Sequence, residues 1–293
     1  MDAPLVSPGR RLRNALAADR PLVLPGLHDA LSARLVQRAG FTAGYLSGSA
    51  TAMTLLGLPD IGLLSGAEII EQARRTTMAS DLALVCDADT GFGNAVNVAY
   101  TVRALEAAGV AAIQIEDQTF PKRCGHFEGK TVVPAEEMLQ KLRAATEARS
   151  DPDLMIIART DARAAYGIDE AIARGRRYAE AGADVIFVEA PQTVDELRRI
   201  ASEVPAPTLV NVVEGGKTPQ LPLEEYAELG FAIVLYPTAA VRAVAYALEA
   251  LYGHLHAHGG TAGAPVELLP FATRNLINDL AGWEAIGTRA AER

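Results

Sequence analysis

Three acidic residues follow neighbouring apolar segments of the chain and could do chemistry together. Asp87 and Asp89 come directly after one apolar run, and Glu116 comes directly after the next. Side chains two residues apart on an extended chain point the same way, so the two aspartates should converge. Converging carboxylates repel unless a cation lies between them, and an all-oxygen site selects Mg²⁺ or Mn²⁺. We therefore predict a metal site of Asp87, Asp89 and Glu116. The alternative is that one aspartate caps a turn while the other pairs with Arg159.

The second chemical feature is a long polar segment, Thr119–Pro134, which contains Lys122-Arg-Cys-Gly-His126. Polar segments of this length inside a compact domain are usually functional lids or disordered. A thiol flanked by lysine, arginine and histidine should have a lowered pKa, because each cation favours the thiolate. Cys124, with His126 beside it, is therefore a candidate acid, base or nucleophile, and the alternative is an incidental loop cysteine. Gly125 would let the loop fold over a substrate.

Polar or small residues follow most of the other apolar runs as well, and we expect them to share one rim. They are Ser47, Gly48, Ser49, Arg159, Asp161, Glu189, Asn211 and Thr238. Arg159 is costly to bury without an anion. We expect it to bind a substrate carboxylate, to form a salt bridge with Glu116 or Glu189, or to do both. Arg242 either binds a second carboxylate or faces solvent. This convergence of polar residues favours an enzyme.

Eight short apolar runs position these residues, and amphipathic stretches separate them. The runs are Leu22–Leu24, Gly44–Leu46, Leu82–Cys86, Ala111–Ile115, Met155–Ala158, Val185–Val188, Thr208–Val210 and Ala232–Leu235. Runs this apolar suit parallel strands that are covered on both faces. Eight such units predict an α/β fold of the (β/α)8 TIM-barrel type, whose active site lies at the carboxyl ends of the strands. An open doubly wound sheet is the alternative, but no glycine-rich phosphate turn follows the first strand.

The chain continues beyond the eighth predicted strand. Val241–His258 is expected to be the last barrel helix, Gly259–Pro265 a linker, and Phe271–Ala291 a helical tail with an apolar stripe. We therefore expect a barrel over residues 1–258 and an extension over residues 259–293. The stripe must be buried against this barrel or against a partner subunit.

Composition narrows the possible partners and the compartment. The chain of 293 residues has a formal net charge of -9 and no basic cluster, which argues against binding nucleic acid or an anionic membrane surface. Its two cysteines, Cys86 and Cys124, argue against a disulfide scaffold and suit a reducing compartment. Cys86 alternates along its strand to the side opposite Asp87, so we expect it to be a packing residue. Pro21–Pro25 is apolar but too short for a signal segment or a membrane span. We expect a cytoplasmic protein.

Over residues 10–250 the chain resembles the isocitrate lyase/phosphoenolpyruvate mutase superfamily. The matching stretches are Tyr45–Ser49, Asp87–Gly93, Ile115–Asp117, Lys122–His126, Ala158–Asp161 and Asn211–Pro219. The resemblance implies a modified (β/α)8 barrel that binds Mg²⁺. It also implies a homo-oligomer, a dimer of dimers in which a C-terminal helix is swapped between subunits.

The Cys124 loop resembles the lyase branch, which comprises isocitrate, 2-methylisocitrate and 2,3-dimethylmalate lyases and the related oxaloacetate hydrolases. This resemblance implies cleavage of a carbon–carbon bond in a 2-hydroxy dicarboxylate or tricarboxylate, giving a 2-oxoacid such as pyruvate and a saturated acid. The run Val212–Pro219 is more similar to the branch that takes 2-alkylmalates. Oxaloacetate hydrolysis is the alternative.

The resemblance also implies roles for individual residues. Cys124 would protonate the carbanion, and Tyr45, Asp60 or a metal-bound water would remove the hydroxyl proton. Ser47, Gly48 and Ser49 would hold the 2-oxoacid part of the substrate. The remaining substrate ligands would be Gly125, Arg159, Glu189, Asn211 and Arg242.

Overall fold

A computed structural model describes residues 6–18, 21–125 and 127–291. The chain divides into two units, Met1–Val241 and Arg242–Arg293, and each is described by itself.

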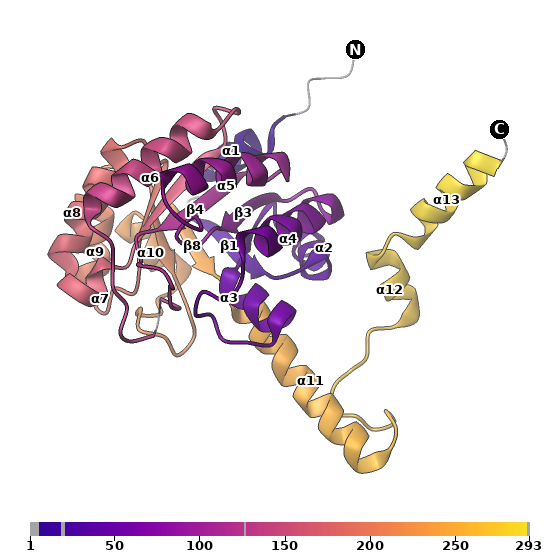
Figure 1. The fold of residues 1–293 in the computed structure, drawn as a ribbon. Coiled ribbons are helices and arrows are strands. Elements are labelled where there is room, and N and C mark those ends of the chain that lie inside the picture. Colours follow the sequence, from indigo (N-terminus) through magenta and orange to yellow (C-terminus); the bar gives the residue numbers. More distant parts are fainter. Residues whose placement is uncertain (1–5, 19–20, 126, 292–293) are drawn as a thin grey trace. The chain divides into compact units, whose positions relative to one another are not determined.

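The first unit is a closed barrel of eight parallel strands, which confirms the predicted fold (Figure 1). The strands are β1 (Leu22–Leu27), β2 (Ala43–Leu46), β3 (Ala83–Asp87), β4 (Ala112–Glu116), β5 (Met155–Thr160), β6 (Val185–Val188), β7 (Thr208–Asn211) and β8 (Ile233–Tyr236). Each overlaps one predicted apolar run. Consecutive strands are neighbours, and β8 pairs with β1 to close the ring. All their carboxyl ends therefore meet at one rim.

Helices surround the barrel in Figure 1. They are α1 (Pro8–Ala18), α2 (Ala30–Arg38), α3 (Gly48–Thr51), α4 (Gly66–Ala79), α5 (Ala95–Ala107), α6 (Ala135–Ala148), α7 (Ala162–Tyr166), α8 (Ile168–Glu180), α9 (Val194–Glu203) and α10 (Leu223–Leu229), with a π-helical turn at Ala52–Leu56. Side chains at several helix starts accept backbone N–H groups that would otherwise lack partners, as at Ser65, which forms a capping box with Glu68. Gly230 ends α10 in the left-handed conformation that favours glycine.

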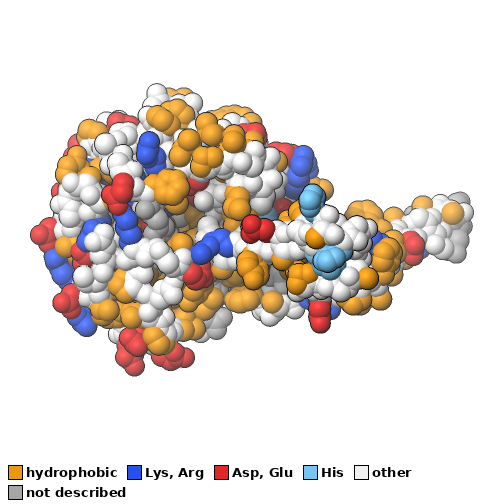
Figure 2. Space-filling model, turned by 90° about the horizontal axis from the view of Figure 1, so that it is seen from below, with side chains coloured by type: hydrophobic (Ala, Val, Ile, Leu, Met, Phe, Trp, Pro, Cys, Tyr) orange, Lys and Arg blue, Asp and Glu red, His pale blue; other side chains and the backbone are white. Residues whose placement is uncertain are grey.

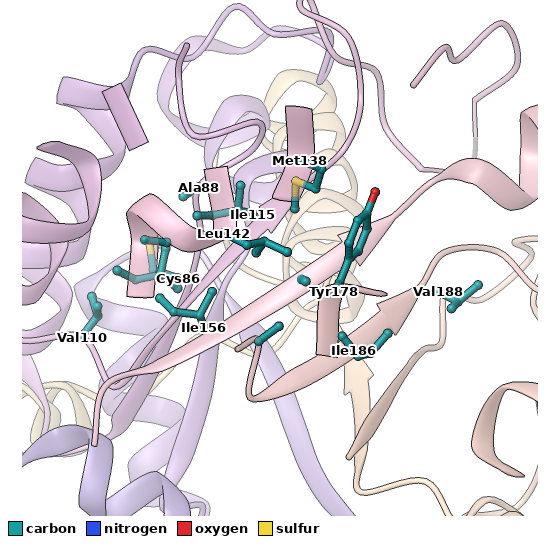
Figure 3. Close-up of a cluster of buried hydrophobic side chains, with 14 of the residues drawn as sticks. Cys86, Ala88, Val110, Ile115, Met138, Leu142, Ile156, Tyr178, Ile186 and Val188 are labelled. Carbon is teal, nitrogen blue, oxygen red and sulfur yellow. The ribbon is translucent and has the colours of Figure 1, made fainter. Parts of the chain in front are cut away.

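Two apolar layers hold the barrel together. Residues that point inward, such as Val85, Ile157 and Phe187, fill its interior. Their neighbours along the strands point outward and pack under the helices. Figure 3 shows part of this outer layer, which contains Cys86 and Tyr178. Cys86 is fully buried there, which confirms the prediction that it is a packing residue.

The second unit contains most of α11 (Ala239–His258), together with α12 (Phe271–Ile277) and α13 (Leu280–Ala291). The predicted helical tail is thus two helices, separated at Asn278 and at Asp279, whose φ is +54°. Several large apolar side chains of this unit are exposed, among them Trp283 at 65%, and hydrophobic surface is visible in Figure 2. None of the helices in the described ranges has the length and apolar character that a membrane span requires.

Candidate active site

The carboxylates of Asp87 and Asp89 lie together at the end of β3. Asp87 is the last residue of the strand, but Asp89 has a φ of +47° and so does not continue the extended chain from which we predicted the convergence. The pair is brought together by the turn instead, because the amide of Asp89 donates to Asp87 Oδ1 at 3.2 Å. A Cβ on Gly48 would lie 2.9 Å from Asp87 Oδ2 and 3.4 Å from Asp89 Oδ1. Gly48 therefore leaves space between the two carboxylates.

The Lys122 ammonium reaches this rim from the Cys124 loop. Its Nζ lies 2.5 Å from Asp60 Oδ1 and 2.7 Å from Asp89 Oδ1, and the side chain is almost fully buried. Burial alone would lower the pKa of Lys122, but Asp89 and Asp60 raise it well above its usual value. Lys122 is therefore a fixed cation between two acidic segments.

The oxygen-rich end of the barrel carries buried carboxylates, the donor type that a hard cation prefers. Burial raises the pKa of Asp89 to about 7 against the opposing effect of Lys122. Glu116, at the end of β4, keeps a buried Oε1 that accepts no hydrogen bond from the described residues, and burial raises its pKa well above the usual range. A divalent cation would stabilise both carboxylates as anions. Among the described residues, however, no three acidic, histidine or cysteine side chains are grouped as metal ligands.

Arg159 on β5 connects the carboxylates on either side of it. Its Nε lies 3.2 Å from Glu116 Oε2, and its Nη2 lies 3.3 Å from Glu189 Oε2. Asn211 Nδ2 donates to Glu189 Oε2 at 3.3 Å, and its own buried Oδ1 accepts no hydrogen bond within the described ranges. Both salt bridges that we predicted as alternatives to a substrate carboxylate are therefore present, and the substrate role of Arg159 stays a prediction.

The loop that carries Cys124 is fastened to the rim at several points. Its two limbs meet where Thr119 N donates to Thr131 O at 2.9 Å. The buried side chain of Gln118 holds both backbone groups of Arg123, at 2.9 and 2.8 Å. The amide of Cys124 donates to Asp60 O at 3.1 Å, and Cys124 is partly exposed. These contacts place the Cys124 thiol at the mouth of the barrel, and its reactivity stays a prediction.

Gly125 lies directly against the Arg159–Glu189 pair. A Cβ added to Gly125 would lie 2.5 Å from Glu189 Cδ and would overlap the Arg159 guanidinium. Any side chain at this position would therefore push the loop away from the rim. The loop that we predicted as a lid is thus seated on two of the predicted substrate ligands.

Tyr45 points into a hydrogen-bonded chain that the sequence reasoning missed. Its hydroxyl donates to Gln114 Oε1 at 2.9 Å, and Gln114 Nε2 donates to Asp87 Oδ1 at 3.2 Å. Burial and the Asp87 charge raise the pKa of Tyr45 well above its usual value, which disfavours its use as a base. The signal for Gln114 was present in the sequence, because it is a polar residue inside an apolar strand.

Asp117 is a second residue whose importance the sequence reasoning missed. Its Oδ2 accepts hydrogen bonds from Thr160 Oγ1 at 2.7 Å, from Tyr178 at 2.8 Å and from Arg174 at 3.0 Å. The Asp117 carbonyl also accepts the amide of Val133 at 2.8 Å. This fully buried carboxylate therefore joins the ends of β4 and β5 to α8 and to the return limb of the loop.

Ser47 and Ser49 lie at the start of α3, the short helix that follows β2. The Ser47 hydroxyl accepts the amide of Ala50 at 3.2 Å, so it caps α3, and Ser49 lies in the first turn of that helix. Arg242 belongs to the second unit, so its placement at the rim stays a prediction. His126 lies outside the described residues.

The fold and the rim define a (β/α)8-barrel enzyme with an acidic site under a cysteine-bearing loop. The profile of the phosphoenolpyruvate phosphomutase family matches residues 12–256. The chain belongs to this family, within the phosphoenolpyruvate mutase/isocitrate lyase superfamily, as its motifs predicted.

Curated relatives support the predicted class, a carbon–carbon lyase. The chain is 46% identical over 276 residues to 2,3-dimethylmalate lyase of Eubacterium barkeri, covering 94% of each chain. It is 47% identical over 249 residues to 2-methylisocitrate lyase of Bacillus subtilis (strain 168), covering 85% of this chain and 82% of the relative. Among solved structures, oxaloacetate acetylhydrolase in complex with 3,3-difluorooxalacetate is similar with a TM-score of 0.91 and 31% identity, covering 97% of this chain and 98% of the other.

Proposed function

We propose that this protein is a Mg²⁺-dependent lyase that cleaves the carbon–carbon bond of a 2-alkylmalate, giving a 2-oxoacid and a saturated acid. The observation that carries the proposal is the seating of Cys124 and Gly125 beside the Arg159–Glu189 pair, above the carboxylates of β3 and β4. The thiol lies at the mouth of a barrel whose rim carries buried carboxylates and the cations of Arg159 and Lys122. A thiol in this place could protonate a carbanion that forms next to a substrate carboxylate.

The proposed reaction begins with loss of the substrate hydroxyl proton. The bond between C2 and C3 then breaks, C2 becomes a carbonyl carbon, and the electron pair stays on C3 beside its carboxylate. The Cys124 thiol gives its proton to C3, a step that typically contributes about 10²–10⁴-fold in rate. Arg159 would hold a substrate carboxylate, and the seated loop would keep bulk water from the carbanion.

Asp87, Asp89 and Glu116 would hold the cation, directly or through water. When bound, Mg²⁺ would polarise the oxygen that becomes the carbonyl and would stabilise its negative charge. The support for this assignment is the oxygen-only donor set, the space beside Gly48 and the buried Glu116 Oε1, which has no hydrogen-bond partner in the part of the chain that the structure describes. Asp60 is paired with Lys122, and burial raises the pKa of Tyr45, so neither is a free base in this structure. The initiating base stays open among Tyr45, Asp60 and a metal-bound water.

The substrate class rests on sequence similarity. The relative named 2,3-dimethylmalate lyase is covered along 94% of its length, against 82% for the one named 2-methylisocitrate lyase. The run Val212–Pro219 supports the same choice. Oxaloacetate hydrolysis is the second candidate, because a solved oxaloacetate acetylhydrolase has the same fold with a TM-score of 0.91.

A substrate panel tests the proposal. The purified protein is assayed with 2,3-dimethylmalate, 2-methylisocitrate, isocitrate and oxaloacetate, with and without a chelator. We expect pyruvate and a saturated acid from 2,3-dimethylmalate, and loss of this activity with the chelator. Oxalate and acetate from oxaloacetate alone would identify a hydrolase, and no product from any of the four would refute an enzyme of this branch.

We also propose that the protein is a cytoplasmic homo-oligomer, a dimer of dimers with exchanged C-terminal helices. The exposed apolar side chains of the second unit, including Phe271, Leu276 and Trp283, support an occupant of matching character, and a second copy supplies one. Cys86 and Cys124, the two cysteines of the sequence, form no disulfide, which supports a reducing compartment. On the face in Figure 2, the described Lys and Arg side chains are scattered among acidic ones, which supports a partner other than nucleic acid.

A further inference from the structure

Lys130 lies on the return limb of the Cys124 loop, and its ammonium is buried between two acceptors. Its Nζ donates to the carbonyl oxygen of Gly125 and lies 2.7 Å from Asp161 Oδ1, while its side chain is 1% exposed. A buried ammonium is stable only when anions or dipoles replace the water it has lost. Lys130 therefore ties the segment next to Cys124 to a carboxylate of the barrel.

Asp161 is a rigid anion that both Lys130 and Arg159 use. Arg159 Nε lies 2.9 Å from Asp161 Oδ2, and the amide of Asp161 donates to Asp117 Oδ1 at 2.9 Å. Burial by itself would raise the pKa of Asp161, but Arg159 and Lys130 lower it to about 2. The carboxylate therefore stays charged and fixed at neutral pH.

We propose that Lys130 is a positioning residue that keeps Cys124 and Gly125 seated over Arg159, by bridging the Gly125 carbonyl oxygen and the Asp161 carboxylate. The inference deepens the proposed function, on which its catalytic part rests, because Cys124 must be held at one place to protonate a carbanion. Its structural part, the placement of the loop, does not depend on the reaction.

A simpler role for Lys130 would be to neutralise Asp161. Arg159 already contacts both oxygens of Asp161, at 2.9 and 3.1 Å. A cation needed only for neutralisation would not need a second acceptor on the loop backbone, whereas a positioning residue does. The bond from Lys130 to the Gly125 carbonyl is therefore the contact that separates the two roles.

The two cysteines allow a test that does not depend on turnover. Cys124 is partly exposed in the loop and Cys86 is buried in the barrel, so alkylation of Cys124 reports loop opening and alkylation of Cys86 reports unfolding. Rates with iodoacetamide are measured at each thiol by mass spectrometry. Two variants change the proposed contact: Lys130→Met removes it, and Lys130→Gln keeps a neutral donor. Glu128→Gln is the control, because Glu128 lies in the same loop and the change removes only its exposed ion pair with Lys217.

We expect Lys130→Met to speed alkylation of Cys124 by about tenfold, the effect of losing one charge-assisted hydrogen bond, with Cys86 unchanged. Losing a nearby cation would by itself favour the thiol and slow the reaction, so faster alkylation indicates greater access. Lys130→Gln should show a smaller increase, and Glu128→Gln less than twofold. If Lys130→Met does not fold, the Cys124 alkylation rate of Lys130→Gln is compared with that of Glu128→Gln, and a faster rate in Lys130→Gln supports the positioning role.

Three results would overturn the inference. Cys124 could react within twofold of the wild-type rate in both Lys130 variants, or Cys86 could speed up in parallel, which would indicate a structural role. With the substrate that the wild type turns over, kcat of Lys130→Met should be about tenfold lower than that of the wild type, and KM should change less. Unchanged kcat with an opened loop would refute the catalytic part. If no substrate is turned over at all, the proposed function fails while the alkylation rates still decide the role of Lys130.

Discussion

The substitution Gly125→Ala tests whether the seated loop is the productive one. Its Cβ would lie 2.5 Å from Glu189 Cδ and 2.7 Å from Cγ, against an optimum of about 3.5–4.0 Å between carbons. These neighbours cannot withdraw cheaply, because Glu189 is paired with Arg159 at 3.3 Å in a buried site. Overpacking of this kind costs about 1–3 kcal/mol. At about 1.4 kcal/mol for each factor of ten, the seated loop would be disfavoured about 5- to 150-fold.

The assay is kcat/KM with the best substrate of the panel, together with thermal unfolding. We expect kcat/KM to fall by roughly 5- to 150-fold, the factor by which the seated loop is disfavoured. The melting temperature should change little, because the loop can relieve the overlap by lifting from the rim. Gly129→Ala is the matched control: it strains a left-handed residue of the same loop, at φ +74°, with no atom within 4 Å of its Cβ. That strain is present whether the loop is seated or lifted, so its loss should be smaller.

Two outcomes would refute this reasoning. A Gly125→Ala enzyme with kcat/KM within twofold of wild type would mean that the loop does not act from the position seen here. An equal loss in Gly129→Ala would mean that loop stiffness, and not contact with the Arg159–Glu189 pair, controls the rate.

Four further outcomes are expected. Cys124→Ser should keep the wild-type melting temperature and lose at least about 10²-fold in kcat; full activity would place the acid elsewhere. Mg²⁺ should raise the melting temperature of the wild type through binding to the folded state, but not that of Asp89→Asn; equal shifts would move the cation away from Asp89. Asp117→Ala should cost about 3–5 kcal/mol of unfolding free energy in urea, because it removes the acceptor of buried donors from Thr160, Tyr178, Arg174 and the amide of Asp161; a cost below about 1 kcal/mol would contradict the role assigned to Asp117. Trp283→Lys should lower the molar mass measured by light scattering, since a charge would enter an apolar interface; an unchanged mass would argue against exchange of the tail.

Much of the barrel was predictable, because its signal is local. A parallel strand covered on both faces is a short apolar run whatever its neighbours are, so all eight were found. The residues that end those runs, such as Asp87 and Glu116, were found for the same reason. The alternation of a strand also placed Cys86 in the outer layer correctly.

What escaped prediction depends on pairings across long stretches of chain. Lys122 meets Asp89, and Lys130 meets Asp161, only because the loop folds back over the rim. No periodicity in the loop encodes that path. The positive φ of Asp89 was also missed, because an aspartate adopts it through a local turn that the Asp-x-Asp spacing does not reveal. Asp117 was hidden because its partners lie on β5 and α8.

The seam between β1 and β8 has a consequence for how the protein is made. Leu22 pairs with Ile233 and Pro25 with Tyr236, so the ring closes through residues from opposite ends of the barrel sequence. Contacts between such distant segments form slowly, because a long loop must be closed before they stabilise the fold. During synthesis β1 leaves the ribosome well before its partner and stays an unpaired strand edge, which is prone to aggregation. Truncation before β8 should therefore yield an insoluble chain, not a smaller folded barrel.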